Sequence, residues 1–521
     1  MKPEMSWSET ITTLQNALGP EQVLDDEDVR IGLSMDISPP DNLAIAGLVV
    51  QAKSPEDVKI VVQTAAKSGA SVSVRGGGMS YTGGYQVSHN DTILLDLSHL
   101  SSVVSIYEED RFMVVEAGCT WQSVQDALDH SGLRSQLRGP ISGDISTVGG
   151  AASQNLPGSM DSILGIEVVT SQGELVRTGS LGAYEGYGFY RNFGPDLTGL
   201  FLGDCGTLGV KTKVALRLEP APSGMAFGSY AFDTMQDIAA AMTRVSQNGL
   251  SVRTYGLDPL KNKTATKVDT REGLDTLKKI VTTSSKGLLG GLVDATKVAT
   301  AGKKAFDHVP WSMHVTTEGV DQVSADSLKR EIDSICLERG RSIEPSIPMA
   351  MAAKPYSIRG VLGIKGERWV PLMGVFPFSK VKKAVEETER FFDRHSGSLL
   401  DLGIIHSFMM SSGDGYMLIE SMFYWPDTFL PLHREALGVE RIKKFGVRKA
   451  NPKARALVSQ LRTELRDLYF DLGAVFAQAG KFYRFKEAMQ PSTIGLIENI
   501  KECVDSRHLL SPGNLGLGHR K

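Results

Sequence analysis

The segment from Arg75 to Gly84 has the composition of a binding loop. Five of its ten residues are glycine, and it follows a β-branched strand at residues 71–74. Glycine loses more backbone entropy on ordering than any other residue, so such a run is not explained by stability. A loop that lacks Cβ atoms exposes consecutive backbone N–H groups, which form a concave anion site. We interpret the segment as a loop that binds the pyrophosphate of a large planar cofactor.

Two further glycine-rich segments lie at residues 139–150 and 203–209. Ser146 and Thr147 in the first of them offer hydroxyl donors to a phosphate or to the edge of a cofactor ring. Each of the three segments adjoins a predicted strand, which is hard to explain if all three are simple turns. No Gly-x-Gly-x-x-Gly motif opens a helix and no Gly-Lys-Ser/Thr phosphate loop is present, so the two common nucleotide-binding motifs are excluded.

His406 and Glu420 form a second candidate site. The pattern predicts a hairpin over residues 404–425 that turns at residues 412–415, which would place the two side chains opposite each other. Glu420 lies in an apolar strand, where burial raises the pKa of a carboxyl group that has no partner. The pair could act as a base, contribute half of a metal site, or simply hold the sheet together.

The elements that must position these residues follow from hydrophobic periodicity and turn signals. In the first part we expect helices at 55–69 and 121–130, strands at 71–74, 92–97 and 209–218, and hairpins at 103–117 and 165–179. The proline-rich stretch at residues 220–222 indicates a domain boundary. In the second part we expect helices at 236–248, 379–395 and 454–478, a strand at 369–377 and the 404–425 hairpin.

Length and composition restrict the class of protein. A chain of 521 residues is too long for one core, so two or three domains are expected. A net charge of −4 argues against a nucleic-acid partner. The four cysteines, Cys119, Cys205, Cys336 and Cys503, are too widely spread for a disulfide framework or a zinc site, which favours a reducing compartment. The first residues lack a signal-peptide core and no apolar run would span a bilayer, so we expect a cytoplasmic protein.

Taken together, these segments resemble the vanillyl-alcohol oxidase / p-cresol methylhydroxylase superfamily of FAD-dependent oxidoreductases. The resemblance extends over most of the chain and is strongest over residues 45–220 and 480–518. It rests on the two pyrophosphate loops, the segment that closes the FAD domain and a C-terminal Pro-Gly loop, which correspond to residues 75–84, 142–150, 193–201 with 206–210, and 510–516.

The resemblance implies an α+β protein with three parts. Residues 1–221 would form the two-subdomain FAD-binding domain, residues 222–475 a cap domain with an antiparallel sheet, and residues 476–521 a segment that returns to the FAD domain. The implied FAD contacts are Arg75, Gly76, Gly77, Gly78, Met79, Ser80, Gly83, Pro140, Gly143, Ser146, Thr147, Gly149, Gly150, Ser153, Gly206, Gly209, Val210 and Asn514. Met79 stands near the position of the histidine that some members bond to FAD, so non-covalent FAD is expected.

The resemblance also suggests a phenolic substrate. Tyr483-Arg484 is similar to the Tyr-Arg pair with which para-substituted phenol oxidisers hold a phenolate, and Tyr81 matches their second phenol-binding tyrosine. A phenol has a pKa of about 10, so neutral water keeps it protonated. Two hydroxyl donors and a guanidinium would favour its anion, which makes hydride loss from the para carbon to flavin N5 easier. The leading hypothesis is therefore oxidation of a 4-hydroxybenzylic alcohol or an alkylphenol.

A second hypothesis is an FAD-dependent D-2-hydroxy acid dehydrogenase, to which the chain is also similar. Arg359, Arg368 or Arg484 would hold the substrate carboxylate, and His406 or Glu420 would take the hydroxyl proton. Of the metal-binding His-x-Gly-Asp-Gly-Asn-x-His pattern of that branch, only Gly413-Asp414-Gly415 is present. No metal is expected, because two or three ligands are missing.

A third hypothesis is a flavin-binding electron-transfer subunit. Residues 286–306 place apolar side chains on one helical face next to lysines, which suits a membrane surface, a partner protein or the core of the protein itself. The expected partners are a small-molecule substrate and either oxygen or a protein electron acceptor, with a homodimer as a further expectation.

Overall fold

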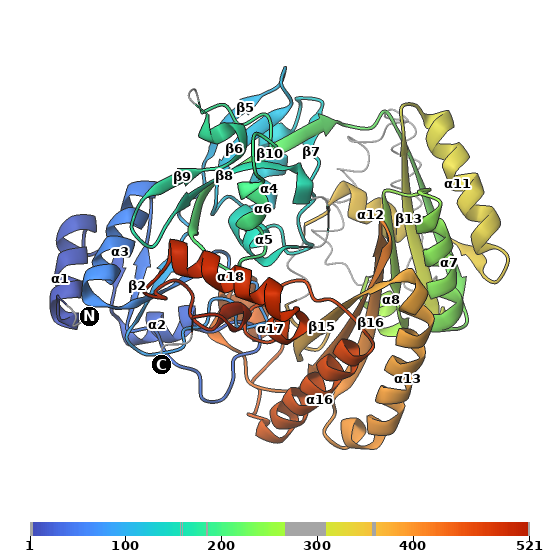
Figure 1. Cartoon of the computed structure of the whole chain (residues 1–521). Coiled ribbons are helices and arrows are strands. Elements are labelled where there is room, and N and C mark those ends of the chain that lie inside the picture. Colours follow the sequence, from blue (N-terminus) through green and yellow to red (C-terminus); the bar gives the residue numbers. More distant parts are fainter. Residues whose placement is uncertain are drawn as a thin grey trace.

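The computed structural model describes residues 4–156, 158, 160–183, 186–265, 309–356 and 361–518, and three β-sheets organise this part of the chain (Figure 1). A four-stranded and a six-stranded sheet hold the strands up to Pro220, and a seven-stranded sheet holds those from Gly224 onward. The predicted α+β class and the antiparallel sheet of the second part are confirmed.

The four-stranded sheet contains the strand that leads into the first glycine segment. Its order is β1 (Val23–Leu24), β2 (Leu48–Gln51), β4 (Thr92–Asp96) and β3 (Ser71–Arg75), and β2, β4 and β3 run parallel. The helices beside it are α1 (Trp7–Leu18), α2 (Glu27–Ser34) and α3 (Pro55–Ser68). Ligands bind beyond the carboxyl ends of parallel strands, and β3 delivers residues 76–84 to such a position.

Helix α3 has a defined cap at each end and buries one apolar face. The Ser54 hydroxyl accepts the Asp57 N–H at 3.1 Å as an N-cap, and Gly69 ends the helix with a φ of +69°. Val58, Val61, Val62 and Ala65 are fully buried against the four-stranded sheet. The predicted helix at residues 55–69 is confirmed.

The six-stranded sheet is antiparallel and packs beside the first one. Its strands are β5 (Val103–Tyr107), β6 (Phe112–Glu116), β10 (Val210–Pro220), β8 (Ile163–Val169) and β9 (Leu175–Arg177), with β7 (Leu133–Ser135) paired to the end of β10. Both predicted hairpins are confirmed. The helical segments of this part are α4 (Trp121–Leu128), α5 (Val148–Gln154), η1 (Met160–Ser162), η2 (Gly179–Gly182) and α6 (Leu197–Leu200).

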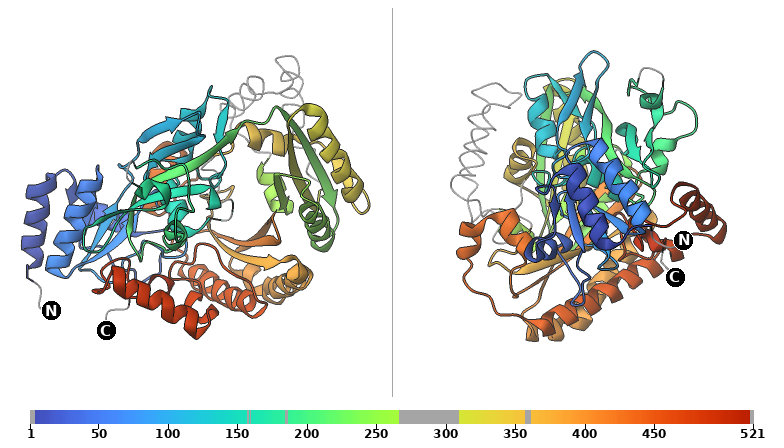
Figure 2. Two further views of the ribbon diagram at one scale, coloured as in Figure 1. Left: turned by 45° about the horizontal axis from the view of Figure 1, so that its top comes forward. Right: turned by 90° about the vertical axis from the view of Figure 1, so that its left-hand side faces the viewer.

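The seven-stranded sheet, which we call the cap sheet, is antiparallel throughout. Its order is β14 (Arg341–Ile343), β11 (Gly224–Phe232), β13 (Trp311–Gly319), β12 (Arg253–Leu257), β16 (Ile405–Gly413), β17 (Tyr416–Trp425) and β15 (Arg368–Pro377). Helices α7 (Met235–Gln247), α11 (Gln322–Cys336) and α13 (Phe378–Asp401) cover its outer face (Figures 1 and 2). Its inner face is turned toward the first two sheets (Figure 2).

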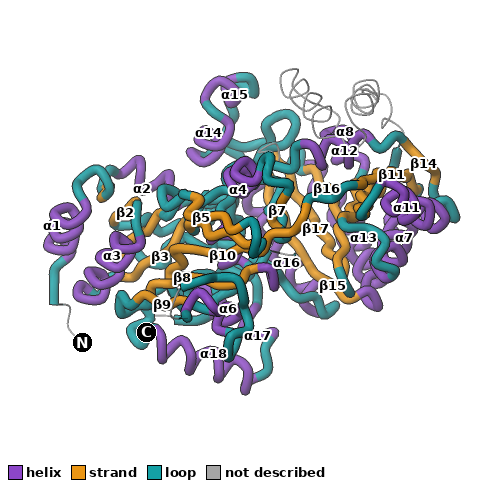
Figure 3. Tube along the Cα trace, turned by 90° about the horizontal axis from the view of Figure 1, so that it is seen from above, coloured by secondary structure: helices purple, strands orange, loops and turns teal. Residues whose placement is uncertain are grey.

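Shorter helices and the long helix α16 complete the second part. They are α8 (Pro259–Ala265), α12 (Ser346–Ala353), α14 (Pro431–Leu437), α15 (Val439–Lys443) and α16 (Pro452–Asp471), and Figure 3 shows α14 and α15 away from the cap sheet. The prediction that α16 extends to residue 478 is wrong. Gly473 adopts a φ of +81°, and Val475 then pairs with Val375 of β15, so the chain leaves the helix to run along the sheet.

The C-terminal segment returns to the four-stranded sheet. It contains α17 (Phe485–Ala488), α18 (Pro491–Val504) and η4 (Asn514–Gly516). Leu510 forms a parallel bridge with Val72 of β3, in which the Val72 N–H donates to Leu509 O at 2.8 Å and the Ser511 N–H donates to Val72 O at 2.7 Å. The tail thus lies against the strand that leads into the first glycine segment.

Two candidates from the sequence lie outside the described residues. They are the amphipathic stretch at 286–306 and Arg359. Among the described helices, none combines the length and the hydropathy needed to cross a membrane.

Candidate functional site

Loop 1, residues 76–84, presents backbone donors. Within the described part of the chain, the N–H groups of residues 77–81 meet no hydrogen-bond acceptor. The loop is held from below by Asp36, whose carboxylate accepts the Gly83 N–H at 3.0 Å and the Ser38 N–H at 2.8 Å. Burial raises the pKa of Asp36, and these hydrogen bonds act against the rise. A run of unsatisfied N–H groups in a fixed loop is an anion cradle.

Arg75 braces loop 1 from the end of β3. Its buried guanidinium donates to Gly76 O at 3.1 Å and lies 3.5 Å from Asp96. A Cβ atom on Gly78 would come within 2.6 Å of Arg75 Nη2, so the side chain fills the space under the loop. The predicted contact of Arg75 with FAD stays a prediction.

Loop 2, residues 139–147, lies directly against loop 1. A Cβ atom on Gly76 would approach Thr147 Oγ1 to 2.4 Å, and one on Gly77 would approach Ile145 O to 2.0 Å. Only glycine allows this backbone contact. The Ser142 and Ser146 hydroxyls are 2.7 Å apart, and Thr147 Oγ1 accepts the Gly150 N–H at 3.2 Å as the cap of α5.

Several predicted FAD contacts have a structural explanation in the protein itself. Tyr356 fills the space beside Gly143, Ala117 the space beside Gly149, and Val168 the space beside Gly209. Val210 is a buried residue of β10. The carbonyl groups of Pro140 and Ser153 accept N–H groups from Gly143 and Cys205. A cofactor contact at any of these six positions stays a prediction.

The tail, residues 509–516, forms hydrogen bonds to two of the glycine loops. Asn514 Nδ2 donates to Gly84 O and to Cys205 O, both at 2.7 Å, which joins loop 1 to loop 3 (residues 203–209). The buried Lys501 ammonium donates to Thr207 O at 2.6 Å and to Leu510 O at 3.1 Å, and it pairs with Asp505 at 2.5 Å. Ser511 Oγ would lie 3.0 Å from a Cβ atom on Gly206.

These residues fit a dinucleotide cofactor. The cradle of loop 1 is narrow enough to exclude Cβ atoms, and three polar atoms around it, Thr82 Oγ1, Gln86 Nε2 and Asn514 Oδ1, are buried without a protein partner. Buried polar atoms normally have a hydrogen-bond partner, so an uncompensated set beside an anion cradle indicates a ligand.

Tyr81 and Tyr483 meet at one residue of the cap sheet. Tyr81 comes from loop 1 and Tyr483 from the C-terminal segment. The Tyr81 hydroxyl lies 3.6 Å from Met373 Sδ, and the Met373 N–H donates to the Tyr483 hydroxyl at 2.8 Å. Burial raises the pKa of Tyr483 to about 12 and that of Tyr81 well above its ordinary value, so both remain hydrogen-bond donors at neutral pH.

Arg484 does not join this pair, which contradicts the prediction. Its guanidinium lies 3.5 Å from Asp467 and 4.4 Å from the centre of the Phe470 ring, and about a third of the side chain is exposed. The chain turns into α17 directly after Tyr483, so consecutive side chains point to different sides.

Arg462 of α16 supplies the buried cation instead. Its Nε donates to Pro371 O at 3.1 Å and its Nη2 donates to Tyr81 O at 2.5 Å, while the guanidinium stacks 3.9 Å from the centre of the Phe482 ring. Its charge opposes the rise in pKa that burial imposes on both tyrosines. The sequence signal was a basic residue among the buried side chains of the apolar helix face, Val458, Leu461 and Leu465.

Glu420 and His406 are separated by the sheet, so the predicted pairing is wrong. The register places His406 opposite Phe423 and Glu420 opposite Met409, which leaves the two on different faces. His406 stacks on Phe392 of α13 at 4.5 Å on the outer face. Glu420 lies on the inner face, where burial raises its pKa and the charge of Lys261 acts against that rise. It is close enough to affect the pKa of both Tyr81 and Tyr483.

The other residues of the hydroxy acid hypothesis have structural partners. Gly413 is the last residue of β16, and Asp414-Gly415 forms the turn to β17. Arg368 is buried 3.4 Å from Asp427 and lies over the Trp425 ring. A search of the described residues finds no group of three or more His, Cys, Asp or Glu side chains that could hold a metal ion.

Comparison with known proteins gives the same picture of the cofactor. A family model described as an FAD-binding domain matches residues 46–179. The mitochondrial D-lactate dehydrogenase [cytochrome] of Arabidopsis thaliana is 26% identical over 216 residues, which is 40% of this chain and 36% of that protein. The glycolate oxidase subunit GlcD of Bacillus subtilis is 28% identical over 212 residues, 39% of this chain and 43% of that protein. The matches thus span less than half of these relatives.

Solved structures match over the whole length. The 4-ethylphenol oxidase of Gulosibacter chungangensis has a TM-score of 0.74 at 18% identity and covers 99% of both chains. A p-cresol methylhydroxylase with bound substrate has a TM-score of 0.74 at 17% identity and covers 100% of both.

The chain therefore contains an FAD-binding domain and has the fold of a p-cresol methylhydroxylase. The predicted fold and the predicted FAD cofactor are thereby confirmed. Loop 1, loop 2 and the tail are the residues that would hold FAD.

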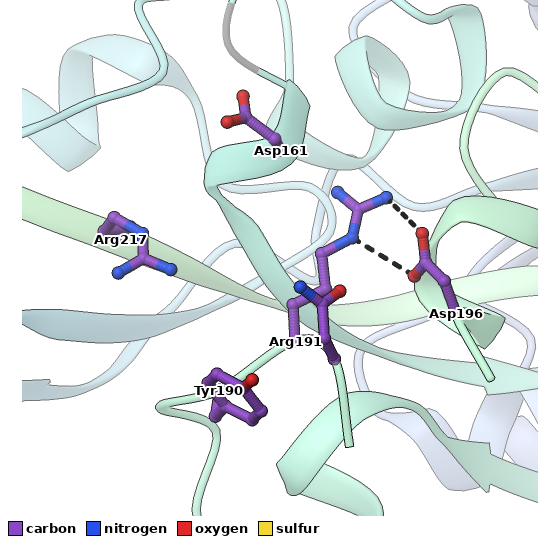
Figure 4. A pocket seen from close by; sticks show the side chains of 6 residues that line it. Asp161, Tyr190, Arg191, Asp196 and Arg217 are labelled. Carbon is purple, nitrogen blue, oxygen red and sulfur yellow. Dashed lines mark hydrogen bonds and ion pairs between the residues drawn. The ribbon is translucent and has the colours of Figure 1, made fainter. Parts of the chain in front are cut away.

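A separate cavity lies on the first part of the protein (Figure 4). Its volume is about 350 Å³, and it is lined by Asp161, Tyr190, Arg191, Asn192, Asp196 and Arg217. Arg191 forms two hydrogen bonds with Asp196 across it, at 3.1 and 2.8 Å. None of these residues belongs to the glycine loops or to the group around Tyr81, so the cavity is distinct from the candidate site.

Proposed function

We propose that this protein is an FAD-dependent oxidoreductase that oxidises a para-substituted phenol. The observation that carries the proposal is the convergence of the Tyr81 and Tyr483 hydroxyls at Met373, next to the buried Arg462. Three distant segments of the chain contribute to this one polar group. It lies on the inner face of the cap sheet, beside loop 1.

The chemistry follows from these side chains. Two tyrosine hydroxyls can donate to one phenol oxygen, and a buried guanidinium nearby favours the phenolate. The negative charge then increases electron density at the para carbon and weakens its C–H bond toward hydride loss. FAD, when bound, supplies the acceptor for that hydride. A Met at position 79 supports non-covalent FAD, which acid precipitation tests, since the flavin then stays in the supernatant.

Glu420 is the residue we assign to proton transfer. A benzylic alcohol must lose its hydroxyl proton as it is oxidised, and a carboxylate on the same inner face can accept it. Burial gives Glu420 a raised pKa, which makes it a stronger base than an exposed carboxylate, and Lys261 helps to keep it ionised.

Anaerobic mixing with 4-hydroxybenzyl alcohol tests the proposal through the loss of flavin absorbance. We expect Tyr483→Phe to slow flavin reduction by about 10²-fold, the usual effect of removing one donor to a developing anion. Tyr469→Phe is the matched control, because it removes an equally buried hydroxyl that bonds to Thr388 and Ser421 on the outer face. Benzyl alcohol, which lacks the phenol, should not reduce the flavin. Equal rates for both alcohols would contradict the proposal.

A second candidate is a D-2-hydroxy acid dehydrogenase, as the names of the relatives suggest. Glu420 would then take the proton of the 2-hydroxyl group. Anaerobic bleaching by D-lactate or D-2-hydroxyglutarate, with none by phenols, would favour it. For either substrate, oxygen or a protein would accept the electrons, and a rate of reoxidation in air comparable to flavin reduction would identify an oxidase. The third candidate, an electron-transfer subunit, rested on residues 286–306 and has no support in the described residues.

A further inference from the structure

The inner face of the cap sheet carries a second polar group, on strand β12. A Cβ atom on Gly256 would come within 2.9 Å of Ile238 and 3.1 Å of Met242 in α7, so Gly256 faces the outer helices. Side chains alternate along a strand, and Arg253, Tyr255 and Leu257 therefore face inward. This is the same face that carries Glu420.

Arg253 has no partner for its charge. Within the described ranges its guanidinium forms no hydrogen bond and no ion pair, although the side chain is partly buried. Burial and the nearby charge of Arg138 both lower the pKa of its guanidinium, and the charge of Glu318 acts against this decrease without forming an ion pair. Taking a cation out of water without a counterion is costly, and native proteins rarely keep such a group unless a ligand completes it.

The Tyr255 hydroxyl beside it is also unsatisfied. Tyr255 is 6% exposed, and its hydroxyl oxygen has no hydrogen-bond partner. Arg253 and Tyr255 are two residues apart on β12, so their side chains lie on the same face of the sheet. A free cation and a free donor on one strand face form half of an oxyanion site.

The surrounding charges leave this cation unneutralised. Arg134 and Arg138, which come from β7 and the loop after it, both bind Glu318 of β13, with contacts of 2.5 and 3.0 Å. Arg134 also contacts Glu219 at 2.7 Å. Three guanidinium groups thus face two carboxylates, and the group carries one excess positive charge.

The position of the group connects it to the candidate site. Tyr356, on whose hydroxyl the charges of Arg253 and Arg138 both act, packs against Gly143 of loop 2. Leu257, Met409 and Glu420 lie in one row across β12, β16 and β17. Arg253 is four residues from Leu257, which places its Cα roughly 17 Å from that of Glu420, given about 3.4 Å per residue and 4.8 Å between strands.

We propose that Arg253, with Arg138 and the Tyr255 hydroxyl, binds a carboxylate or phosphate group between the cap sheet and loop 2. One source of this group is the far end of the substrate, which would then be a phenol that carries an anionic chain. The other source is the cofactor. The assignment of the anion to the substrate rests on the proposed function, whereas the binding of an anion at this site does not.

Calorimetric titration of the holoenzyme with inorganic phosphate and with acetate tests the site. We expect one saturable site in the wild type and in Arg217→Met, which removes an exposed arginine elsewhere. Arg253→Met should weaken binding at least tenfold, Tyr255→Phe should weaken it by a smaller factor, and Arg253→Lys should retain part of it. Flavin content and unfolding curves show whether each variant is folded.

The source is identified by comparing two phenols and the cofactor. If the substrate supplies the anion, Arg253→Met should raise KM at least tenfold for a 4-alkylphenol with a terminal carboxylate and leave KM for 4-hydroxybenzyl alcohol unchanged. If the cofactor supplies it, the holoenzyme should not bind phosphate and Arg253→Met should weaken FAD binding at least tenfold. Absence of phosphate and acetate binding, together with unchanged FAD affinity and unchanged KM values in Arg253→Met, would overturn the proposal. If no phenol reduces the flavin, the proposed function fails while the anion titration still reports on the site.

Discussion

Replacing Arg462 by methionine tests whether Arg462 or Arg484 stabilises a phenolate bound beside the two tyrosines. The substitution keeps the length of the side chain and removes the donors to Pro371 O and Tyr81 O. Hydrogen bonds from a charged group contribute roughly 1.5–3 kcal/mol each. The variant no longer has to bury a charge, which offsets part of the lost hydrogen-bond energy. We therefore expect the free energy of unfolding to fall by about 3 kcal/mol.

The same change should alter the ionisation of a bound phenol. For an assumed separation of about 8 Å, a unit charge in an effective dielectric of about 20 contributes about 2 kcal/mol, or about 1.5 pKa units. The pKa of bound 4-hydroxybenzaldehyde, followed by its change in absorption on ionisation, should therefore rise by that amount in Arg462→Met. Arg484→Met should leave it unchanged, because Arg484 is partly exposed and paired with Asp467.

Arg466→Met is the matched control for folding effects. Arg466 lies one turn further along α16, donates to Phe482 O at 2.9 Å and lies over the same Phe482 ring at 5.2 Å. If Arg484→Met raises the pKa of the bound phenol and Arg462→Met does not, the assignment of Arg462 is refuted and the Tyr-Arg pair of the sequence motif is restored.

Two further changes test the carboxylate and the tail. Burial raises the pKa of Glu420 in the folded state above its ordinary value of 4.5. At low pH the carboxyl group is protonated in both the folded and the unfolded state, so it has no effect on stability. As the pH rises, the unfolded state ionises freely, whereas the folded state pays the cost of a buried charge, which lowers the free energy of unfolding. Glu420→Gln should thus stabilise the protein against thermal unfolding at about pH 8 but not at about pH 4. It should also slow flavin reduction by about 10²–10⁴-fold. The same difference in stability between variant and wild type at both pH values would count against a raised pKa. Asn514→Ala removes both donors that join loop 1 to loop 3, so flavin fluorescence should report at least tenfold weaker FAD binding. Ser88→Ala, which removes only a contact to Pro512 O, should keep wild-type affinity, and equal losses in the two variants would show that the Asn514 bridge has no special role.

Local signals in the sequence predicted most elements correctly. The cap of α3, the turn at Asp414-Gly415 and the glycine loops all act over a few residues, so they can be recognised without knowledge of the rest of the chain. The return of the tail was also predictable, through the resemblance of the Pro-Gly loop.

The wrong predictions concern the direction in which a side chain points, which short sequence patterns do not determine. His406 and Glu420 would face each other only if the hairpin register differed by an odd number of residues, because every such shift moves a side chain to the other face. Arg484 adjoins Tyr483 in the sequence, yet the start of α17 turns it outward. Arg462 acts on a carbonyl group 381 residues away, a contact that no local pattern encodes.

The short strand that Leu510 adds beside β3 has a consequence for biosynthesis. Loop 1 is translated hundreds of residues before Asn514, which later fixes it to Cys205. Until residues 509–516 have left the ribosome, the early sheets can fold, but their glycine loops lack the hydrogen bonds from Asn514. FAD should therefore bind tightly only after this segment has emerged.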